Sequence, residues 1–414
     1  PGRLPQPSET HSGSDHPGGD IANRNRESRD SDSELAQVCE LLGPTDDPSK
    51  LGRLGHYEVI GIVGTGATAV VLKALDGPLH RFVAIKLLRP TLAASSQARK
   101  RFSREARSAA SIVHENVIEI FGVSEDEALP YLVMPYIAGE SLAKRIERTS
   151  PMSIDSILHI ACQVADGLQA AHEKSLMHRD IKPSNILLGP GVERLKLTDF
   201  GLARAIDDVG LTKTGIVAGT PEYMSPEQAS GLSIDHRSDL FSLGSVLYTM
   251  CTGRSPFQAE GCLAVLRKIT DDEPPAIPTI RTDVPDWLIR LVNQLMAKNV
   301  DDRPDSAAVV ASQLRQCLAH RKDARHPLPM ELQSEPSWSQ RLRRPSTIVL
   351  VAFVAALSLL FWSWDDSEPS KESGRSDEMR AADELLRWND GVTDSILELD
   401  AEIEALHRDV SDAD

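Results

Sequence analysis

Apolar and polar positions follow two different patterns along the middle of the chain. From residue 57 to about residue 90, short apolar runs such as "YEVIGIV" and "FVAIKLL" are separated by small and polar residues, as in successive strands. From residue 96 onward the segments are longer, as in "SQARKRFSREARSAASIV" and "DHRSDLFSLGSVLYTMCTG", and their composition favours helix. The pattern predicts a folded region over residues 57–318 whose first third is mainly strands and whose remainder is mainly helices.

The two ends of the chain differ from this region in composition. Residues 1–50 are rich in Ser, Asp, Gly, Pro and Arg, so we expect them to be mostly disordered, with a short amphipathic helix at "SELAQVCELLG". Residues 1–33 lack an apolar stretch, so we expect no signal peptide among them. Residues 319–346 carry Pro and Arg with little periodicity, which predicts a basic linker. The first residue is Pro1 rather than Met, which fits a fragment as well as an irregular start.

The most apolar stretch of the chain is "TIVLVAFVAALSLLFW", and the 18 residues 347–364 carry no charge. A helix of that length is roughly 27 Å long, close to the hydrocarbon thickness of a bilayer. A buried core helix is the alternative, but such a helix usually shows a polar edge. Three arginines precede the stretch and two aspartates follow it, while Trp362 and Trp364 lie at its end. The positive-inside rule therefore predicts a single-pass transmembrane helix whose N-terminal side faces the cytoplasm.

The segment after this stretch, residues 365–414, is acidic and has the pattern of an amphipathic helix. Its apolar positions do not form a sustained heptad repeat, so a coiled coil is only weakly supported. A short sensor, a helical dimerisation stalk and the start of a longer extracytoplasmic domain all stay open as interpretations.

Charge and cysteine content narrow the classes of function. The formal net charge is −16, of which residues 1–50 contribute −5 and residues 365–414 contribute −12, so the middle of the chain is close to neutral. Acidity at the ends does not oppose phosphate binding in the middle. No basic patch typical of nucleic-acid binding stands out. The five cysteines lack CxxC spacing, which argues against a zinc site or a disulfide framework and favours a reducing compartment.

A glycine-rich turn follows the first predicted strand. "GTGATAVV" begins at Gly64, and turns of this kind let backbone N–H groups approach phosphates because no Cβ stands in the way. By itself such a turn also fits an ordinary hairpin. The later strand "FVAIKLL" contains Lys86 between apolar residues, and a paired, partly buried lysine explains that setting better than an exposed strand edge does.

The stretch "MHRDIKPSNILL" concentrates polar chemistry between two hydrophobic flanks. Transfer of a phosphoryl group to an alcohol needs a carboxylate for the hydroxyl proton, a cation for the charge on the moving group, and ligands for magnesium. Asp180, Lys182 and Asn185 offer these three functions in one loop. Beyond a further predicted strand, "KLTDFGLA" supplies Asp199 as the principal magnesium ligand. A hairpin with a salt bridge is the alternative for each segment taken alone.

These motifs, in this order, resemble the signature of protein kinases, and in particular the bacterial membrane-anchored serine/threonine kinases of eukaryotic type. The resemblance covers residues 57–318. It implies an α+β, bilobal protein kinase fold, with a small antiparallel β lobe that carries helix C and a larger helical lobe, to which the sequence adds one transmembrane helix. ATP would bind in the cleft with Mg²⁺. Lys182, two residues after the expected base, resembles the serine/threonine class.

The resemblance also implies roles for single residues. Asp180 would be the base, Lys182 would reach the γ-phosphate, and Lys86 would hold the α- and β-phosphates. Helix C would supply a carboxylate partner for Lys86, and Asn185 and Asp199 would bind Mg²⁺. The residues expected to act in catalysis are Asp180, Lys182, Asn185, Lys86 and Glu105.

The resemblance implies that the nucleotide site is formed by residues from several segments of the predicted β lobe. Met134 would be the gatekeeper and Ile137 would offer its N–H to adenine, while Pro135 would stiffen the hinge. The position of the third glycine is occupied by Ala69, so we expect a stiffer loop. The full set expected to contact the nucleotide is Val63, Gly64, Thr65, Gly66, Val71, Ala84, Lys86, Met134, Ile137, Asn185 and Asp199.

Residues farther along are expected to support the site. Glu227 in "SPE" resembles a glutamate that pairs with a buried arginine, here Arg303, and Asp239 resembles the aspartate that braces the catalytic loop. The activation segment would lie between Asp199 and "SPE". Within it Thr212 and Thr214 would be autophosphorylated and would then pair with Arg179, next to the base; Thr220 would contact the base and the lysine instead of being modified.

Two interpretations of function stay in view. The first is an active, membrane-anchored, non-specific serine/threonine protein kinase, cytoplasmic in its kinase domain and extracytoplasmic in its C-terminal segment, that phosphorylates proteins and self-associates for autophosphorylation in trans. The second is a catalytically weak, nucleotide-binding scaffold. The filled catalytic positions favour the first. A kinase of small molecules is a narrower alternative, which the complete segment "GTPEYMSPE" disfavours.

Overall fold

The computed structural model describes residues 36, 38–66, 68–124, 130–190, 194–200 and 221–333. Three groups of predictions lie outside these residues. They are the disorder of residues 1–35, the threonines of the activation segment within residues 201–220, and the transmembrane helix and acidic segment within residues 334–414.

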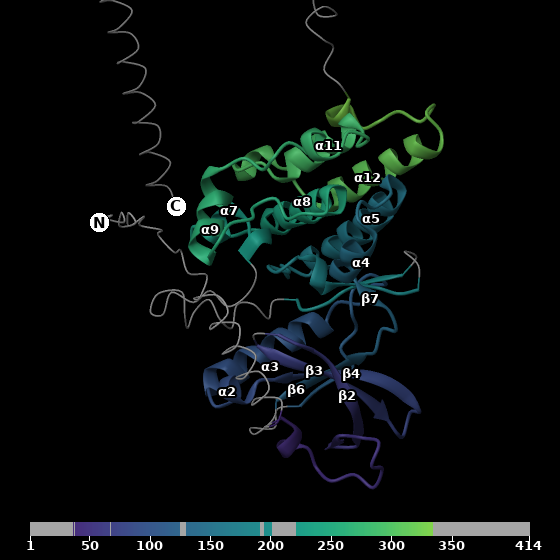
Figure 1. The fold of residues 1–414 in the computed structure, drawn as a ribbon, viewed down its shortest axis with the longest axis vertical. Helices are drawn as coiled ribbons and strands as arrows, with labels where there is room; N and C mark the ends of the chain where they lie inside the picture. Colours follow the sequence, from purple (N-terminus) through teal and green to yellow (C-terminus); the bar gives the residue numbers. More distant parts are fainter. Residues whose placement is uncertain are drawn as a thin grey trace, which may run out of the picture. The chain divides into compact units, whose positions relative to one another are not determined.

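Within the described residues, the small lobe is an antiparallel sheet of six strands, drawn in purple and blue in Figure 1. The strands lie in the order β1-β2-β3-β4-β6-β5, and the short helix α2 (Pro90–Ala93) and the longer helix α3 (Ser96–Ala110) follow β4 in the chain. The strand bounds are β1 (Gly52–Leu54), β2 (Tyr57–Thr65), β3 (Ala69–Asp76), β4 (Arg81–Leu88), β5 (Gly122–Ser124) and β6 (Tyr131–Pro135).

The central strand β4 explains why its sequence is a nearly continuous apolar run. Val83, Ile85 and Leu87 belong to the hydrophobic cluster on one face of the sheet. Ala84 and Leu88 belong to the cluster on the other face, together with residues of α3. Because successive side chains of a strand point to opposite faces, a strand covered on both sides needs apolar residues at consecutive positions.

The large lobe contains a three-stranded sheet and most of the helices, in teal and green in Figure 1. Helix α8, in a segment that the sequence predicted to be helical, is buried along nearly its whole length and contacts α5 and α11. The elements are β7 (Glu140–Ser141), α4 (Leu142–Thr149), α5 (Ile154–His172), η1 (Pro183–Asn185), β8 (Ile186–Leu188), β9 (Leu195–Leu197), η2 (Pro221–Tyr223), α7 (Pro226–Ala229), α8 (Arg237–Thr252), α9 (Cys262–Asp271), α10 (Ile277–Ile280), α11 (Asp286–Leu295), η3 (Val300–Asp302), α12 (Ala307–Lys322) and η4 (Met330–Leu332).

The folded part of the chain extends beyond the predicted limits of 57 and 318. Val38 is fully buried against the outer face of the small sheet, and Gly43 forms a bridge with Arg53 in β1. The expected disorder of residues 1–50 is therefore wrong for residues 38–50, although the short helix predicted there is present at residues 38–41. At the other end α12 continues to Lys322, and Leu332 is buried in the large lobe.

Two further expectations concern membranes and thiols. Among the described residues, no helix is both long enough and apolar enough to cross a bilayer. All five cysteines are free thiols.

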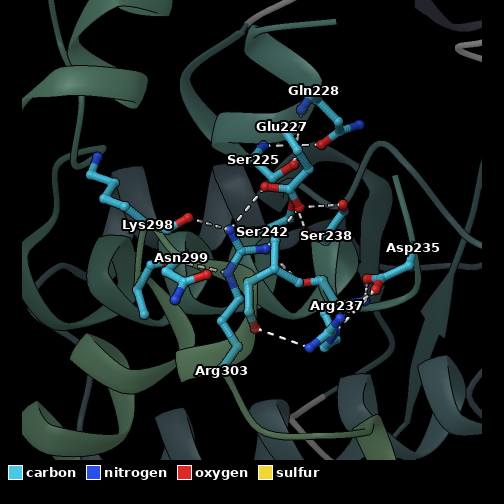
Figure 2. A network of polar contacts seen from close by, with 12 residues as sticks. Ser225, Glu227, Gln228, Asp235, Arg237, Ser238, Ser242, Lys298, Asn299 and Arg303 are labelled. Carbon is cyan, nitrogen blue, oxygen red and sulfur yellow. Dashed lines mark hydrogen bonds and ion pairs between the residues drawn. The ribbon is translucent and has the colours of Figure 1, made fainter. Parts of the chain in front are cut away.

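A buried ion pair between Glu227 and Arg303 ties α7 to the loop before α12, as the resemblance implied. Figure 2 shows the Arg303 guanidinium facing the Glu227 carboxylate, with Nη1 at 2.8 Å and Nη2 at 2.9 Å from its two oxygens. Ser238 donates a further hydrogen bond to the same carboxylate, and Arg303 Nε donates to the carbonyl oxygen of Ala297 at 2.8 Å. Burial alone would raise the pKa of Glu227, but the hydrogen bonds from Arg303 and Ser238 outweigh burial and lower it to about 2.

We predict that Glu227→Gln destabilises the fold by about 3–5 kcal/mol, because it leaves the buried Arg303 charge without its counter-ion. The pKa of Glu227 is lower in the folded chain than its ordinary 4.5, so its stabilisation is fully present above about pH 4.5 and is lost as the pH falls toward 2. Urea unfolding measures the free energy of unfolding of the wild type and of the variant at neutral pH and at steps below pH 4.5. The difference between the two free energies should become smaller as the pH falls.

Asp301→Asn is the matched control, because Asp301 forms an exposed ion pair with Arg237 at 3.0 Å in the same lobe. Exposed ion pairs contribute less than about 1 kcal/mol. An effect of Glu227→Gln as small as that of the control would contradict the assigned role of the buried pair.

Candidate active site

The register of the small sheet brings distant predicted residues into one row. Gly64 on β2 pairs with Val71 on β3, and Val71 pairs with Lys86 on β4. Two residues along β4, Ala84 pairs with Met134 on β6. Directly opposed residues point to the same face, as do residues two apart on one strand. Five of the residues predicted to contact a nucleotide therefore share one face of the sheet.

The glycine-rich turn between β2 and β3 is open on the side that a ligand would approach. Among the described residues, a Cβ added at Gly64 would meet no atom within 4 Å, and one added at Gly66 would meet only the Ala69 carbonyl oxygen, at 3.6 Å. The packing of the chain therefore does not itself require glycine at these positions, whereas close approach of a phosphate to the backbone would. Val63 and Thr65 are exposed beside them.

Ala69 replaces the third glycine of the motif without strain. It is the first residue of β3, it pairs with Leu88, and its side chain is buried. Its φ angle is not positive, so the methyl group does not conflict with the backbone. Gly66 N–H donates to the Ala69 carbonyl oxygen at 2.9 Å, which closes the turn.

Lys86 is buried and forms an ion pair with Asp199, with Nζ at 2.6 Å from Oδ1. Burial would raise the pKa of Asp199, but the charge and hydrogen bond of Lys86 outweigh burial and lower it, so Asp199 is held as a carboxylate. Glu105 lies on the buried face of α3, the helix that the sequence predicted. The pairing of Glu105 with Lys86 stays a prediction.

A short hairpin places Asn185 and Asp199 together. Ile186 at the start of β8 pairs with Leu197 at the end of β9, so the residues just before β8 and just after β9 lie at the same end. Two hydrogen bonds from Thr198 to the Asn185 carbonyl oxygen, from its N–H at 3.0 Å and from its hydroxyl at 3.2 Å, close that end. The two predicted magnesium ligands are therefore positioned by local strand pairing.

The Asp180 carboxylate is held by two neighbours in its own loop. Lys182 Nζ lies 2.8 Å from Asp180 Oδ2, and Asn185 Nδ2 lies 3.0 Å from the same oxygen. Asn185 Nδ2 also donates to the Asp180 carbonyl oxygen at 2.8 Å. Both donors orient the carboxylate, and since the Asn185 amide directs its nitrogen to Asp180, its oxygen is the atom suited to a metal ion.

The backbone just before Asp180 is strained and is held by a buried carboxylate. Arg179 has a φ of 66°, in the left-handed region, which costs a non-glycine residue about 1–3 kcal/mol. Asp239, on α8, accepts the N–H of Arg179 at 2.7 Å and the N–H of His178 at 2.8 Å. Burial would raise the pKa of Asp239, but the hydrogen bond and charge of His172 and the neighbouring His178 lower it. Asp239 therefore has the bracing role that the resemblance implied.

The oxygen-bearing side chains of Asn185 and Asp199 suit a Mg²⁺ ion that is bound together with a phosphate ligand. Among the described residues, no group of three or more His, Cys, Asp or Glu side chains could hold a metal ion. Asn185 and Asp199 supply only two oxygen-bearing side chains, and Mg²⁺ is commonly bound by one or two carboxylates together with water and substrate phosphates. The site therefore suits Mg²⁺ that arrives with a phosphate ligand.

Two residues at this site were not predicted from the sequence. His172, at the end of α5, bonds through Nε2 to Asp239 Oδ2 at 2.8 Å. Gln228, on α7, donates from Nε2 to the Arg179 carbonyl oxygen at 2.9 Å. The spacing of Ser225 and Gln228 is the signature of a helix cap and predicts that local contact. No local pattern indicates either long-range contact.

Comparison with curated proteins finds relatives that share the region described above. The chain is 37% identical over 270 residues to serine/threonine-protein kinase pkn3 of Myxococcus xanthus, covering 63% of this chain and 49% of that protein. It is 37% identical to PknB of Mycolicibacterium smegmatis, covering 63% and 42%, and 36% identical to PrkC of Bacillus subtilis, covering 61% and 39%. The chain thus spans about half or less of the length of these relatives.

Comparison with solved structures supports the fold. The crystal structure of the Mycobacterium tuberculosis PknI kinase domain superposes with a TM-score of 0.53 at 25% identity, covering 64% of this chain and 96% of that one. A second crystal structure of the same domain gives a TM-score of 0.52 at 24% identity and covers 66% and 99%. The family model of the protein kinase domain matches residues 57–320. Because this model matches nearly two thirds of its length, the chain belongs to the protein kinase domain family.

Proposed function

We propose that this chain is a serine/threonine protein kinase that transfers the γ-phosphate of ATP to protein hydroxyl groups. The observation that carries the proposal is the Asp180 carboxylate, held by Lys182 and Asn185 in the same lobe as the Asp199 carboxylate, which pairs with Lys86. That arrangement combines a proton acceptor, two cations and two oxygen ligands, which phosphoryl transfer to an alcohol requires.

The mechanism follows from what each side chain can do. Asp180 accepts the proton of the attacking hydroxyl, and the nearby Lys182 stabilises the charge that grows on the transferred group. Lys86 holds the phosphates in line with the hydroxyl once it exchanges its contact with Asp199 for one with the nucleotide. Mg²⁺, held by Asn185 and Asp199 with phosphate oxygens, would neutralise negative charge on the nucleotide.

The choice of serine and threonine as acceptors rests on two supports. Lys182 follows the base by two residues, as in the serine/threonine class that the sequence resembles. The relatives with 36–37% identity are named serine/threonine-protein kinases. Protein substrates and self-association for autophosphorylation in trans belong to this proposal.

The chain is also proposed to be anchored in a membrane through residues 347–364, with the kinase domain in the cytoplasm. The support is the uncharged length of this stretch and the arginines that precede it. Anchoring would concentrate kinase domains in two dimensions and so favour phosphorylation in trans.

We expect Asp180→Asn to lower kcat by about 10²–10⁴-fold, the usual contribution of general base catalysis, while ATP binding is retained. Phosphate incorporation by the purified full chain, with labelled ATP and Mg²⁺, measures the rate, and calorimetry measures nucleotide binding. Asp199→Asn is the comparator, because it should also weaken Mg²⁺-dependent ATP binding. A wild-type chain that is folded and binds ATP but incorporates no phosphate would favour the scaffold interpretation.

Activation by phosphorylation predicts that Thr212→Ala combined with Thr214→Ala lowers kcat about tenfold without unfolding the domain. The reason is the loss of a charge-assisted pair between a phosphothreonine and Arg179, and one such hydrogen bond corresponds to roughly that factor. Mass spectrometry of the autophosphorylated chain locates the phosphate. Unchanged kinetics and no phosphate at either threonine would remove this switch.

Membrane anchoring predicts that Val354→Asp with Leu357→Asp releases the full chain from the membrane fraction. Each aspartate at the centre of a transmembrane helix costs about 2.5–3.5 kcal/mol. Leu385→Asp with Leu386→Asp adds the same charge in the acidic segment and should leave the chain in the membrane fraction. If the two double variants were found in the membrane fraction to the same extent, the proposed membrane anchor would be wrong.

A further inference from the structure

Both polar groups of the peptide bond that joins Arg179 to Asp180 have hydrogen-bond partners. Its N–H, from Asp180, points at His178 Nδ1 at 3.3 Å. Its carbonyl oxygen, from Arg179, accepts a hydrogen bond from Gln228 Nε2 at 2.9 Å. Because the nitrogen of this peptide is bonded to the Cα atom of Asp180, the orientation of the peptide affects the direction of the Asp180 carboxylate.

Gln228 uses both ends of its side-chain amide. Its Oε1 accepts the backbone N–H of Ser225 at 3.0 Å, and its own backbone N–H donates to Ser225 Oγ at 3.3 Å, which together form the capping box of α7. Figure 2 shows Gln228 turned toward Ser225, beside Glu227. With the oxygen occupied by the cap, only the amide nitrogen is left to meet the Arg179 carbonyl oxygen.

The two contacts make different demands on the residue at position 228. A capping box is satisfied by glutamate as well as by glutamine, because only an acceptor oxygen is needed. The Arg179 carbonyl oxygen needs a donor, which an ionised glutamate lacks. A substitution of Gln228 by glutamate can therefore remove the hydrogen bond to Arg179 while the capping box is kept.

We propose that Gln228 is a positioning residue for the catalytic loop: its amide fixes the strained Arg179–Asp180 peptide and so couples the end of the activation segment to the base. This inference rests on the proposed kinase function. Helix α7 is anchored by Glu227 and Arg303, so the amide of Gln228 is presented from a fixed support. Asp239 holds the other side of Arg179 through its N–H, and the two supports together maintain the left-handed backbone.

Gln228→Glu tests the proposal, with Ser225→Ala as the matched control. The first variant keeps the acceptor of the cap but sets a carboxylate oxygen against the Arg179 carbonyl oxygen, whereas the second weakens the cap and leaves the Arg179 contact in place. In the full chain we expect Gln228→Glu to lower kcat about tenfold with KM for ATP within about twofold, and Ser225→Ala to lower Tm with kcat near that of the wild type.

A pH profile separates positioning from general destabilisation. The carboxyl group introduced at position 228 regains an O–H donor when protonated, so the kcat ratio of wild type to Gln228→Glu should shrink as the pH falls toward its pKa, about 4.3 or above. The titratable and charged groups of this network, which are Glu227, Arg303, Arg179, His178, Asp180 and Asp239, are common to both proteins. A ratio that does not change with pH would count against the donor role.

Hydrogen exchange gives a measurement that does not depend on turnover. Gln228→Glu should speed exchange of the amides of residues 178–180, and Ser225→Ala should speed exchange of α7 alone. An inactive wild-type chain would contradict the proposed kinase function, while exchange would still decide this inference. An active wild type with unchanged kcat and exchange in Gln228→Glu, or equal losses in both variants, would overturn the role of Gln228.

Discussion

The candidate active site depends on the hydrogen bonds that the buried carboxylate of Asp239 accepts. This carboxylate lies on the most buried helix of the large lobe and accepts two consecutive backbone N–H groups of the catalytic loop. A left-handed residue such as Arg179 persists only where its surroundings determine it from more than one side. Asp239 supplies one side through hydrogen bonds that His172 helps to keep oriented, and the position of Asp180 follows from that support.

The residues proposed to contact the nucleotide depend on a different constraint, the register of the small sheet. Gly64, Val71 and Lys86 lie in one row because Gly64 pairs with Val71 and Val71 pairs with Lys86, just after a register shift in β2 between Ile62 and Gly64. A shift of one residue in β4 would move Lys86 to the opposite face, against the cluster that contains Val38. Such a shift would bury the Lys86 charge among the apolar residues of that cluster, so the lysine itself opposes it.

The two halves meet through short backbone connections and through apolar packing, since Ala109 of α3 belongs to the hydrophobic cluster of the large lobe. Ile118 N–H donates to the Leu197 carbonyl oxygen at 2.9 Å, and Leu197 N–H donates to the Asn116 carbonyl oxygen at 2.8 Å, which ties the end of β9 to the segment after α3. The Lys86–Asp199 pair lies next to this connection. Hydrogen bonds of the backbone thus set the distance between the residues proposed to bind phosphate and those proposed to act on the hydroxyl.

The sequence by itself determined which residues make up the candidate site and the type of most elements. Asp180, Lys182, Asn185 and Asp199 are separated by one loop and one hairpin, so local spacing was enough to place them together. The tertiary structure alone decided which distant groups support them: Val38 on the outer sheet face, His172 on Asp239 and Gln228 on Arg179. These contacts join segments far apart in the chain, and they arise from packing and long-range hydrogen bonding, which leave no period or spacing in the sequence.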